Sequence, residues 1–281
     1  MRTPDVVVVG HVVQDLVPGG WRLGGTATFA AVQAQRLGLR VGIVTRAGRD
    51  AELDRRLPEI EIAGRPASRT TAFQNVYQAD RRWQQVPSRA EPLDAEDVPE
   101  EWRTAPVVLL GPVCGEVPPE LSLLFGHSVI GVAAQGWLRR LDRQGRVRRR
   151  AWQGASFWSN CRVFFVSDED LGRRRDQATR WAAEVPVVVV TQYTRGVQVH
   201  SEGRRRRMQA FPVEEVDPTG AGDVFSMAFL VRYQETESVE DSTRFASAAA
   251  AYSVETVGIE GIASRQDIEK RMRAYPEIVL Q

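Results

Sequence analysis

Short runs of consecutive apolar residues recur along this chain of 281 residues, separated by stretches with helical spacing. Val6–Val9 is the first run, and Val107–Leu110, Val129–Ala133 and Pro186–Thr191 follow the same pattern. A strand that is apolar at every position is typical of a parallel sheet with both faces covered. Strands that alternate with helices favour a doubly wound sheet with right-handed crossovers. The sequence therefore predicts a three-layer α/β/α fold, with residues 1–281 as a single domain.

The composition excludes several classes of protein. Hydrophobic residues make up 43% of the chain and charged residues 26%, as in soluble globular proteins. The net charge of +1 provides no overall field that would recruit nucleic acid or an anionic membrane. Lys270 is the only lysine, which argues against a P-loop or a Schiff-base mechanism. The histidines His11, His127 and His200 show no metal-ligand spacing. With no signal peptide and no apolar run of about 18 residues, we expect a cytoplasmic protein.

One segment interrupts the alternation of strands and helices. Thr70–Tyr77 is strand-like, and Arg82–Val86 returns after a short turn, which predicts a hairpin with polar alternation. An exposed hairpin of this kind commonly acts as a lid, and we expect a small β lid from residues 12–23 and 67–90. Packing beneath the hairpin explains its aromatic residues equally well. Three of its side chains are candidates to reach a ligand: Asn75, Tyr77 and Trp83.

A glycine turn precedes a helical pattern in the last quarter of the chain. Gly220–Gly222 places small residues where the N–H groups of a helix N-terminus attract an anion and let a phosphate approach. Asp223 follows directly, where its carboxylate can accept a proton from a hydroxyl that attacks the phosphate. An ordinary helix start capped by Asp217 or Thr219 is the alternative. That alternative gives no reason for the two glycines that flank Ala221.

Two features near the N-terminus indicate a ligand beyond the carboxyl ends of the strands. Asp15 follows the strand Val6–Val9, and ligands of open α/β sheets bind beyond the carboxyl ends of strands. A solvated loop acid is an equally good interpretation of Asp15. Gly24 and Gly25 open a helical pattern over Thr26–Leu37, where they indicate either close approach of a ligand or a tight turn. A dinucleotide site is not expected, because the Gly-x-Gly-x-x-Gly pattern is absent.

In these motifs the chain resembles the ribokinase-like carbohydrate kinases, the PfkB family. Asp217–Asp223 is similar to the C-terminal signature of the family, Gly24-Gly25 to its N-terminal motif, and Asp15 falls where members hold a substrate hydroxyl. The resemblance covers essentially the whole chain. It implies a ribokinase-like, mostly parallel sheet with a small β lid, and a kinase that uses ATP and Mg²⁺. In such a kinase Asp223 would be the catalytic base, and the amides of the glycine turn would form the anion hole.

The resemblance also assigns the remaining contacts. Phe29 and Arg139 would lie on the substrate side with the residues named above, and Mg²⁺ would be held through water by Asp170 or Glu169. The nucleotide would contact Thr191, Tyr193, Gly196, Thr219, Gly220, Gly222, Ala250 and Ser253.

The chain departs from the family pattern at four places, one of which is the bulky Met227 in the helix after Asp223. Phe29 stands where many relatives carry Asn, Tyr193 stands where glycine is common, and Ser167–Asp170 replaces the Asn-x-x-Glu element that organises magnesium. Phe29 implies an acceptor other than ribose, such as another polyol or a nucleoside. The altered Asn-x-x-Glu element leaves open how the chain uses the metal.

The leading hypothesis is ATP-dependent phosphorylation of a sugar or cyclitol. The Gln135–Arg139 stretch resembles a subgroup close to the plant myo-inositol kinases, which makes myo-inositol a candidate. A nucleoside kinase is the first alternative, since Phe29, Phe73, Tyr77 and Trp83 would be able to stack on a base. A non-catalytic sensor of sugars or nucleotides is the second. The acceptor, the hydroxyl that is phosphorylated, the phosphoryl donor and the choice between monomer and homodimer stay open.

Overall fold

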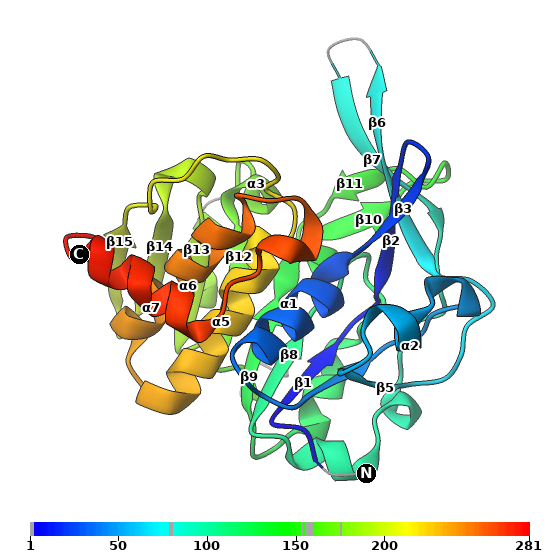
Figure 1. Ribbon diagram of the computed structural model, residues 1–281, viewed down its shortest axis with the longest axis horizontal. Helices are drawn as coiled ribbons and strands as arrows, with labels where there is room; N and C mark the ends of the chain where they lie inside the picture. The colour runs from blue at the N-terminus through cyan, green and yellow to red at the C-terminus, as the bar shows by residue number, and fades with distance from the viewer. Residues whose placement is uncertain (1–2, 79–80, 153, 155–159, 175) are drawn as a thin grey trace.

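A nine-stranded sheet forms the centre of the molecule, in the order β15-β14-β13-β12-β9-β8-β1-β4-β5 (Figure 1). The computed structural model describes residues 1–281 except 1–2, 79–80, 153, 155–159 and 175. All neighbouring pairs from β13 to β5 are parallel, and β14 and β15 join antiparallel. The strands are β1 (Val6–Val9), β4 (Val41–Val44), β5 (Glu61–Ala63), β8 (Val107–Leu110), β9 (Val129–Ala133), β12 (Val163–Ser167), β13 (Val187–Thr191), β14 (Val197–Ser201) and β15 (Arg204–Met208).

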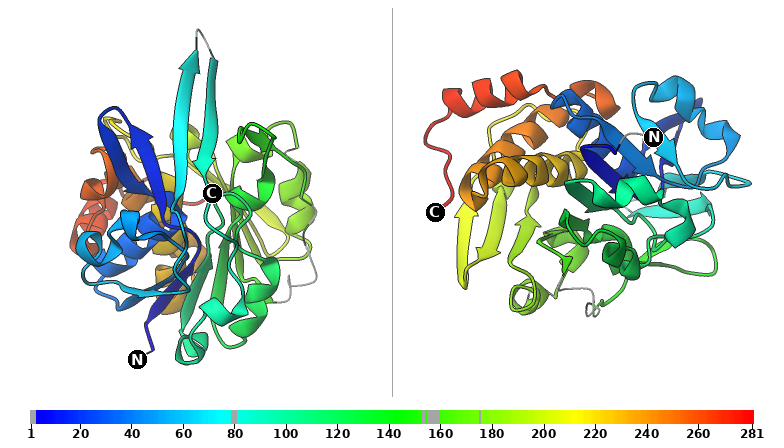
Figure 2. Two further views of the ribbon diagram at one scale, coloured as in Figure 1. Left: turned by 90° about the vertical axis from the view of Figure 1, so that its right-hand side faces the viewer. Right: turned by 90° about the horizontal axis from the view of Figure 1, so that it is seen from below.

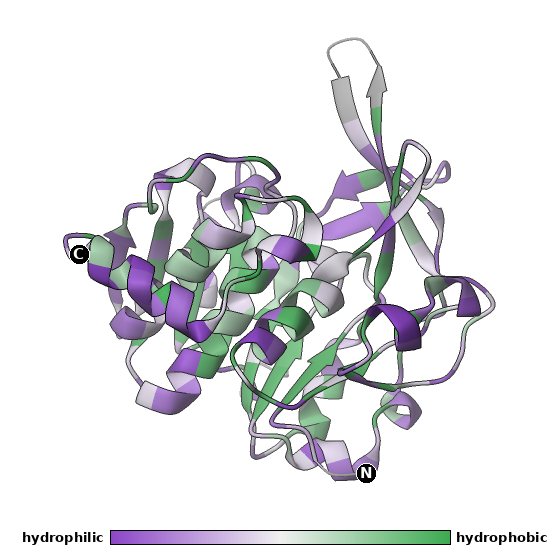
Figure 3. Ribbon diagram, viewed as in Figure 1, coloured by the Kyte–Doolittle hydropathy of each residue, from purple (hydrophilic) through white to green (hydrophobic). Residues whose placement is uncertain are grey.

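Helices cover both faces of this sheet (Figure 2). The side chains of Val6 and Val8 belong to one hydrophobic core, and those of Val7 and Val9 belong to the other. Period-2 alternation thus explains why strands buried on both faces are apolar at every position, as the green strands of Figure 3 show. Burying both faces accounts for the three layers, and the predicted α/β/α fold class is confirmed.

The first core packs under four longer helices and the second under shorter ones. The α-helices are α1 (Gly25–Arg36), α2 (Leu53–Arg56), α3 (Asp168–Leu171), α4 (Asp176–Trp181), α5 (Ala221–Thr236), α6 (Val239–Ser253) and α7 (Arg265–Ala274). The 3-10 helices are η1 (Arg49–Ala51), η2 (Ala95–Asp97), η3 (Glu100–Thr104), η4 (Pro119–Leu124), η5 (Ala134–Leu138), η7 (Tyr193–Arg195) and η8 (Gly258–Gly261). In the described part of the chain, none of these helices combines the length and the apolar character needed to cross a membrane.

The sequence of residues 168–184 predicts one helix capped by Ser167, and the predicted length is wrong. The structure forms α3 and then α4 instead. Ser167 caps α3 as expected, because its side chain accepts a hydrogen bond from the amide of Asp170. Gly172, with φ of 58°, then turns the chain out of the helix.

A second sheet lies beyond the carboxyl end of β1, in the order β3-β2-β6-β7. The chain passes from β1 straight into β2 (Val13–Val17) and β3 (Gly20–Gly24), and β6 (Thr71–Gln78) pairs parallel to β2. β6 and β7 (Arg81–Ser88) form the predicted hairpin, which projects from the body in Figure 1. A further two-stranded sheet, β10 (Arg139–Leu141) with β11 (Val147–Arg149), completes the fold. A lid function for the four-stranded sheet remains a prediction.

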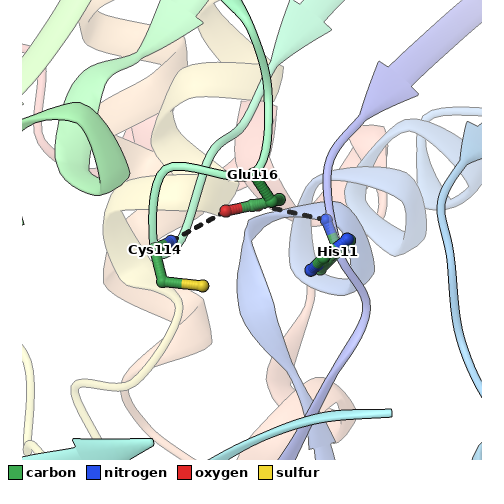
Figure 4. Close-up of side chains that lie close together, drawn as sticks. All are labelled: His11, Cys114 and Glu116. Carbon is green, nitrogen blue, oxygen red and sulfur yellow. Dashed lines mark hydrogen bonds between the residues drawn. The ribbon is translucent and has the colours of Figure 1, made fainter. Parts of the chain in front are cut away.

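The buried His11, drawn with Cys114 and Glu116 in Figure 4, ties both ends of the hairpin to the central sheet. One ring nitrogen of His11 lies 2.8 Å from Oγ1 of Thr71 at the start of β6, and the other lies 3.0 Å from the carbonyl oxygen of Glu91 after β7. The backbone amide of His11 donates to the buried carboxylate of Glu116 at 3.3 Å. These hydrogen bonds therefore hold the base of the hairpin against the central sheet.

His11, Cys114 and Glu116 also form a group of possible metal ligands within 4.8 Å of one another. Their donor atoms are already used, however. Both nitrogens of His11 have partners, and Glu116 accepts from the amides of Val113 and Cys114 at 2.9 and 2.8 Å. Burial raises the pKa of the Cys114 thiol, which keeps it protonated. The cluster is a structural clamp and does not fit a metal site.

Candidate functional site

The N-terminus of α5 presents backbone donors that the protein does not use. Gly220 is the N-cap residue, with φ of 80° and no side-chain cap. Within the described residues, the amides of Gly220 and Gly222 have no hydrogen-bond acceptor. The side chain of Asp217 accepts from the amide of Thr219 at 3.0 Å and does not cap α5. This turn differs from an ordinary capped helix start, and its free amides are compatible with an anion site.

The two glycines of the turn are needed for different reasons. A Cβ built on Gly220 would lie 2.3 Å from the ring of Phe29, so the protein itself excludes a side chain there. A Cβ on Gly222 would meet no atom within 4 Å. The space above Gly222 is open to a ligand. Phe29 is only 1% exposed, so it supports the turn from below in place of the expected contact with substrate.

Asp223 lies in the first turn of α5, directly after this open space. Burial raises the pKa of its carboxyl group to about 6, and the nearby Asp170 carboxylate acts in the same direction. The Thr26 hydroxyl and the Arg139 guanidinium lower that pKa. A carboxylate with a pKa of about 6 is deprotonated at neutral pH and is still basic enough to accept a proton.

Asp15 faces the same region from β2. Its carboxyl oxygen Oδ2 would lie 1.9 Å from a Cβ on Gly24, so Gly24 makes room for this carboxyl group. Burial raises the pKa of Asp15 to about 6, and the negative charges of Asp217 and Asp223 add to the effect. The structure thus brings three carboxyl groups together at one end of the sheet. Gly25, with φ of 82°, is a tight turn against the side chain of Val13.

The expected magnesium ligands do not offer a free carboxylate to this region. One oxygen of Asp170 lies 3.4 Å from Nε of Arg139, and the other accepts a hydrogen bond from Ser167 Oγ at 2.7 Å. Glu169 has an 83% exposed side chain that pairs with Arg149 at 3.4 Å. These contacts do not fit direct ligation of Mg²⁺, and the expected contact through water remains a prediction. Asp170 and Arg139 instead join the surroundings of Asp223.

The residues expected to contact a nucleotide lie at the end of β13 and just after it, in the glycine turn, and on α6. Tyr193 adopts φ of 57°, a left-handed conformation that explains why glycine is common at this position. Its ring is 63% exposed, and its hydroxyl donates to Glu215. Ser253 is 1% exposed and donates to the carbonyl oxygen of Ala250 at 2.9 Å, so it is not open to a nucleotide. The exposed or half-buried residues of this group are Thr191, Tyr193, Gly196, Thr219, Gly220, Gly222 and Ala250.

The hairpin candidates differ in what surrounds them. Asn75 is exposed on β6, while the side chain of Tyr77 lies outside the described part of the chain. Trp83 packs under the guanidinium of Arg146, which lies 5.0 Å from the ring centroid. Phe73 is 6% exposed in a small core beneath the sheet. Packing therefore accounts for Trp83 and Phe73.

Thr26 is a site residue that the sequence patterns did not single out. It is 1% exposed and its hydroxyl influences the pKa of Asp223. Its position as the first polar side chain after Gly24-Gly25 was the available signal.

A mostly parallel central sheet with a small β sheet beyond the strand ends is the architecture of the ribokinase-like fold. The chain matches the model of the pfkB family of carbohydrate kinases over residues 160–264. It is accordingly a small-molecule kinase.

Two curated relatives and one solved structure illustrate the similarity. The cytidine kinase of Thermococcus kodakarensis is 28% identical over 264 residues, which cover 85% of this chain and 92% of that relative. The inositol 3-kinase of Oryza sativa subsp. japonica is 28% identical over 282 residues, covering 90% and 69%. A pyrophosphate-dependent kinase in the ribokinase family, complexed with a pyrophosphate analog and myo-inositol, superimposes with a TM-score of 0.78 at 22% identity, covering 94% and 99%. At that identity the structural likeness establishes the fold alone.

Proposed function

We propose that this kinase transfers a phosphoryl group from ATP to a hydroxyl of a sugar or cyclitol, with myo-inositol as the first candidate acceptor. The observation that carries the proposal is the position of Asp223 directly after the unpaired amide of Gly222. A base and an anion-binding turn are the two parts that phosphoryl transfer to an alcohol needs. The similarity to inositol 3-kinases supports a cyclitol.

In the proposed reaction Asp223 accepts the proton of the acceptor hydroxyl as its oxygen attacks the phosphorus atom in line. The free amides of the glycine turn donate to the oxygens of the transferring group, where negative charge accumulates. Asp15 accepts hydrogen bonds from other hydroxyls of the acceptor and thereby orients it. The β2–β3 and β6–β7 strands would exclude water that would otherwise hydrolyse the donor.

A nucleoside kinase of the same fold is the second candidate. The similarity to a cytidine kinase along 92% of that relative favours it. The burial of Phe73 and the packing of Trp83 on Arg146 leave fewer aromatic side chains for a base than the sequence suggests.

The donor is also part of the proposal. ATP is the donor that the family resemblance implies, and a structural neighbour described as pyrophosphate-dependent makes pyrophosphate the alternative. Mg²⁺, when bound with ATP, would neutralise phosphate charge. Since Asp170 and Glu169 do not fit as direct ligands, no step of the mechanism is assigned to the ion.

Product analysis tests the function most simply. The purified chain is incubated with ATP or pyrophosphate and with myo-inositol, cytidine or ribose, and phosphorylated products are detected by ³¹P NMR. Phosphorylation of myo-inositol with ATP is the expected result. Exclusive phosphorylation of cytidine would favour the second candidate, and the absence of any phosphorylated acceptor would contradict both.

A further inference from the structure

Arg139 pairs with Asp170 at the carboxyl end of the sheet. It begins β10 shortly after β9, and Asp170 follows β12, the strand that pairs with β9. Nε of Arg139 lies 3.4 Å from Oδ1 of Asp170, and its positive charge also acts on Asp223. The side chain is 15% exposed, so the charge is largely shielded from bulk water.

Asp170 is itself held firmly. Its Oδ2 accepts a hydrogen bond from Ser167 Oγ at 2.7 Å, and the same hydroxyl accepts from the Asp170 amide at 3.0 Å. The Asp170 side chain is 7% exposed. With both oxygens engaged, this carboxylate fixes the position of the guanidinium instead of binding an ion.

The terminal nitrogens of Arg139 remain available. A guanidinium carries five N–H donors, and the contact with Asp170 uses Nε. Among the described residues, no acceptor hydrogen bonds to either terminal nitrogen. A partly buried arginine with unused donors is suited to hold the oxygens of a phosphoryl group.

Negative charge is concentrated in this region, so a bound phosphoryl group needs a nearby cation. Asp15, Asp217 and Asp223 place three carboxyl groups around the region where the phosphoryl group would pass. A phosphoryl group entering this region is repelled unless positive charge is present nearby. Arg139 is the basic side chain whose charge acts on Asp223.

We propose that Arg139, fixed by Asp170, is a further catalytic residue that donates hydrogen bonds to the transferring phosphoryl group. The inference rests on the proposed function. In this step the acceptor oxygen forms a bond to phosphorus while the bond to the bridging oxygen of the donor breaks. The hydroxyl proton goes to Asp223, and the bridging oxygen leaves with the electron pair. Asp170 is then a positioning residue, which differs from the role in metal binding expected for Ser167–Asp170.

Four variants test this role: Arg139→Gln, Arg139→Lys, Asp170→Asn and Arg149→Gln. Arg149 is the matched control, because it faces Arg139 in the β10–β11 register but has a 51% exposed side chain. Steady-state rates are measured with ATP and myo-inositol, or with cytidine if cytidine is the accepted substrate, and the melting temperature is recorded for each variant.

Arg139→Gln should lower kcat by about 100-fold or more, on the scale of losing an oxyanion donor, and leave KM for the acceptor within about threefold. Arg139→Lys should recover about tenfold of that loss. Lysine restores the positive charge but lacks the planar guanidinium group that can donate two parallel hydrogen bonds. Asp170→Asn should lower kcat by about tenfold with an unchanged requirement for Mg²⁺, and Arg149→Gln should behave as wild type.

Three outcomes would overturn the inference. If Arg139→Gln keeps kcat within about threefold while Asp223→Asn is inactive, the proposed function stands and Arg139 has no part in transfer. If Asp170→Asn needs at least about tenfold more Mg²⁺ and regains the normal kcat, Asp170 serves the ion and not Arg139. If the wild-type chain transfers phosphate to no acceptor, the proposed function fails and the inference with it.

Discussion

The ring of Phe29 lies directly beneath Gly220, so close that a Cβ on this glycine would fall 2.3 Å from the ring. The contact joins α1 to the N-terminus of α5. It explains how a bulky residue is accommodated where many relatives carry Asn: the ring packs against the turn and is withdrawn from the ligand side. The turn that offers its amides to an anion is therefore supported by the hydrophobic core.

This contact predicts different effects for the two glycines of the turn. Gly220→Ala should lower the free energy of unfolding by about 2 kcal/mol or more, because the methyl group overlaps Phe29 at a left-handed φ. Gly222→Ala should change stability by less than about 1 kcal/mol, yet reduce activity at least about tenfold, since its methyl group enters the space of the ligand. Urea denaturation and steady-state rates measure both. Equal stability losses in the two variants would contradict the assignment.

The raised pKa of Asp223 predicts an acid limb of activity. The base must be deprotonated, so kcat/KM should be constant at neutral pH and fall as the pH drops below about 6. A pH–rate profile of the wild-type chain gives this value directly. Activity that stays constant down to pH ~4.5 would exclude a base in this environment.

The same raised pKa predicts that the Asp223 carboxylate destabilises the folded protein at neutral pH. The native state binds a proton at Asp223 more tightly than the unfolded state, so this carboxyl group destabilises the protein increasingly as the pH rises from about 4 to about 6. Asp223→Asn should therefore raise the free energy of unfolding at pH ~8 by about 1–3 kcal/mol, and the gain should disappear near pH ~4. Chemical denaturation at the two pH values measures the difference. A less stable variant at pH ~8 would contradict the predicted sign.

Glu116 should be important for stability although it lies outside the proposed chemistry. Its buried carboxylate accepts hydrogen bonds from the amides of His11, Val113 and Cys114. Glu116→Gln replaces one accepting oxygen by a donor, and should lower the free energy of unfolding by about 2–4 kcal/mol. Glu96→Gln is the control, because the Glu96 side chain is 78% exposed, and it should change stability by less than about 0.5 kcal/mol. A tolerated Glu116→Gln would show that the clamp is dispensable.

Much of the fold follows from local patterns. Val6–Val9, Val107–Leu110 and Val129–Ala133 match the observed strands residue for residue, since each run is apolar throughout and bounded by turn or loop residues. The helix expected over 168–184 was wrong because apolar spacing continues past Gly172, where the chain takes a left-handed turn. Strands as short as β5 and β10 carry too few residues for a periodic signal.

The site was predictable in part. Gly220–Gly222 and Asp223 stand out because a glycine turn before an acidic helix start has a chemical reason. The proximity of Asp15 to Asp223 depends on how β2 leaves the central sheet, which no local pattern encodes. Phe29 and Ser253 were expected at a ligand and are buried, since spacing alone does not distinguish the face of a helix that packs on its neighbours.

The rate of the Asp223→Asn variant tests the central claim most directly. Asparagine keeps the shape of the side chain but cannot accept the proton of the acceptor hydroxyl. With ATP and the acceptor identified by ³¹P NMR, we expect kcat to fall at least about 100-fold while KM for the acceptor stays within about threefold. A variant with near-normal kcat on that acceptor would contradict the assignment of Asp223 as the catalytic base.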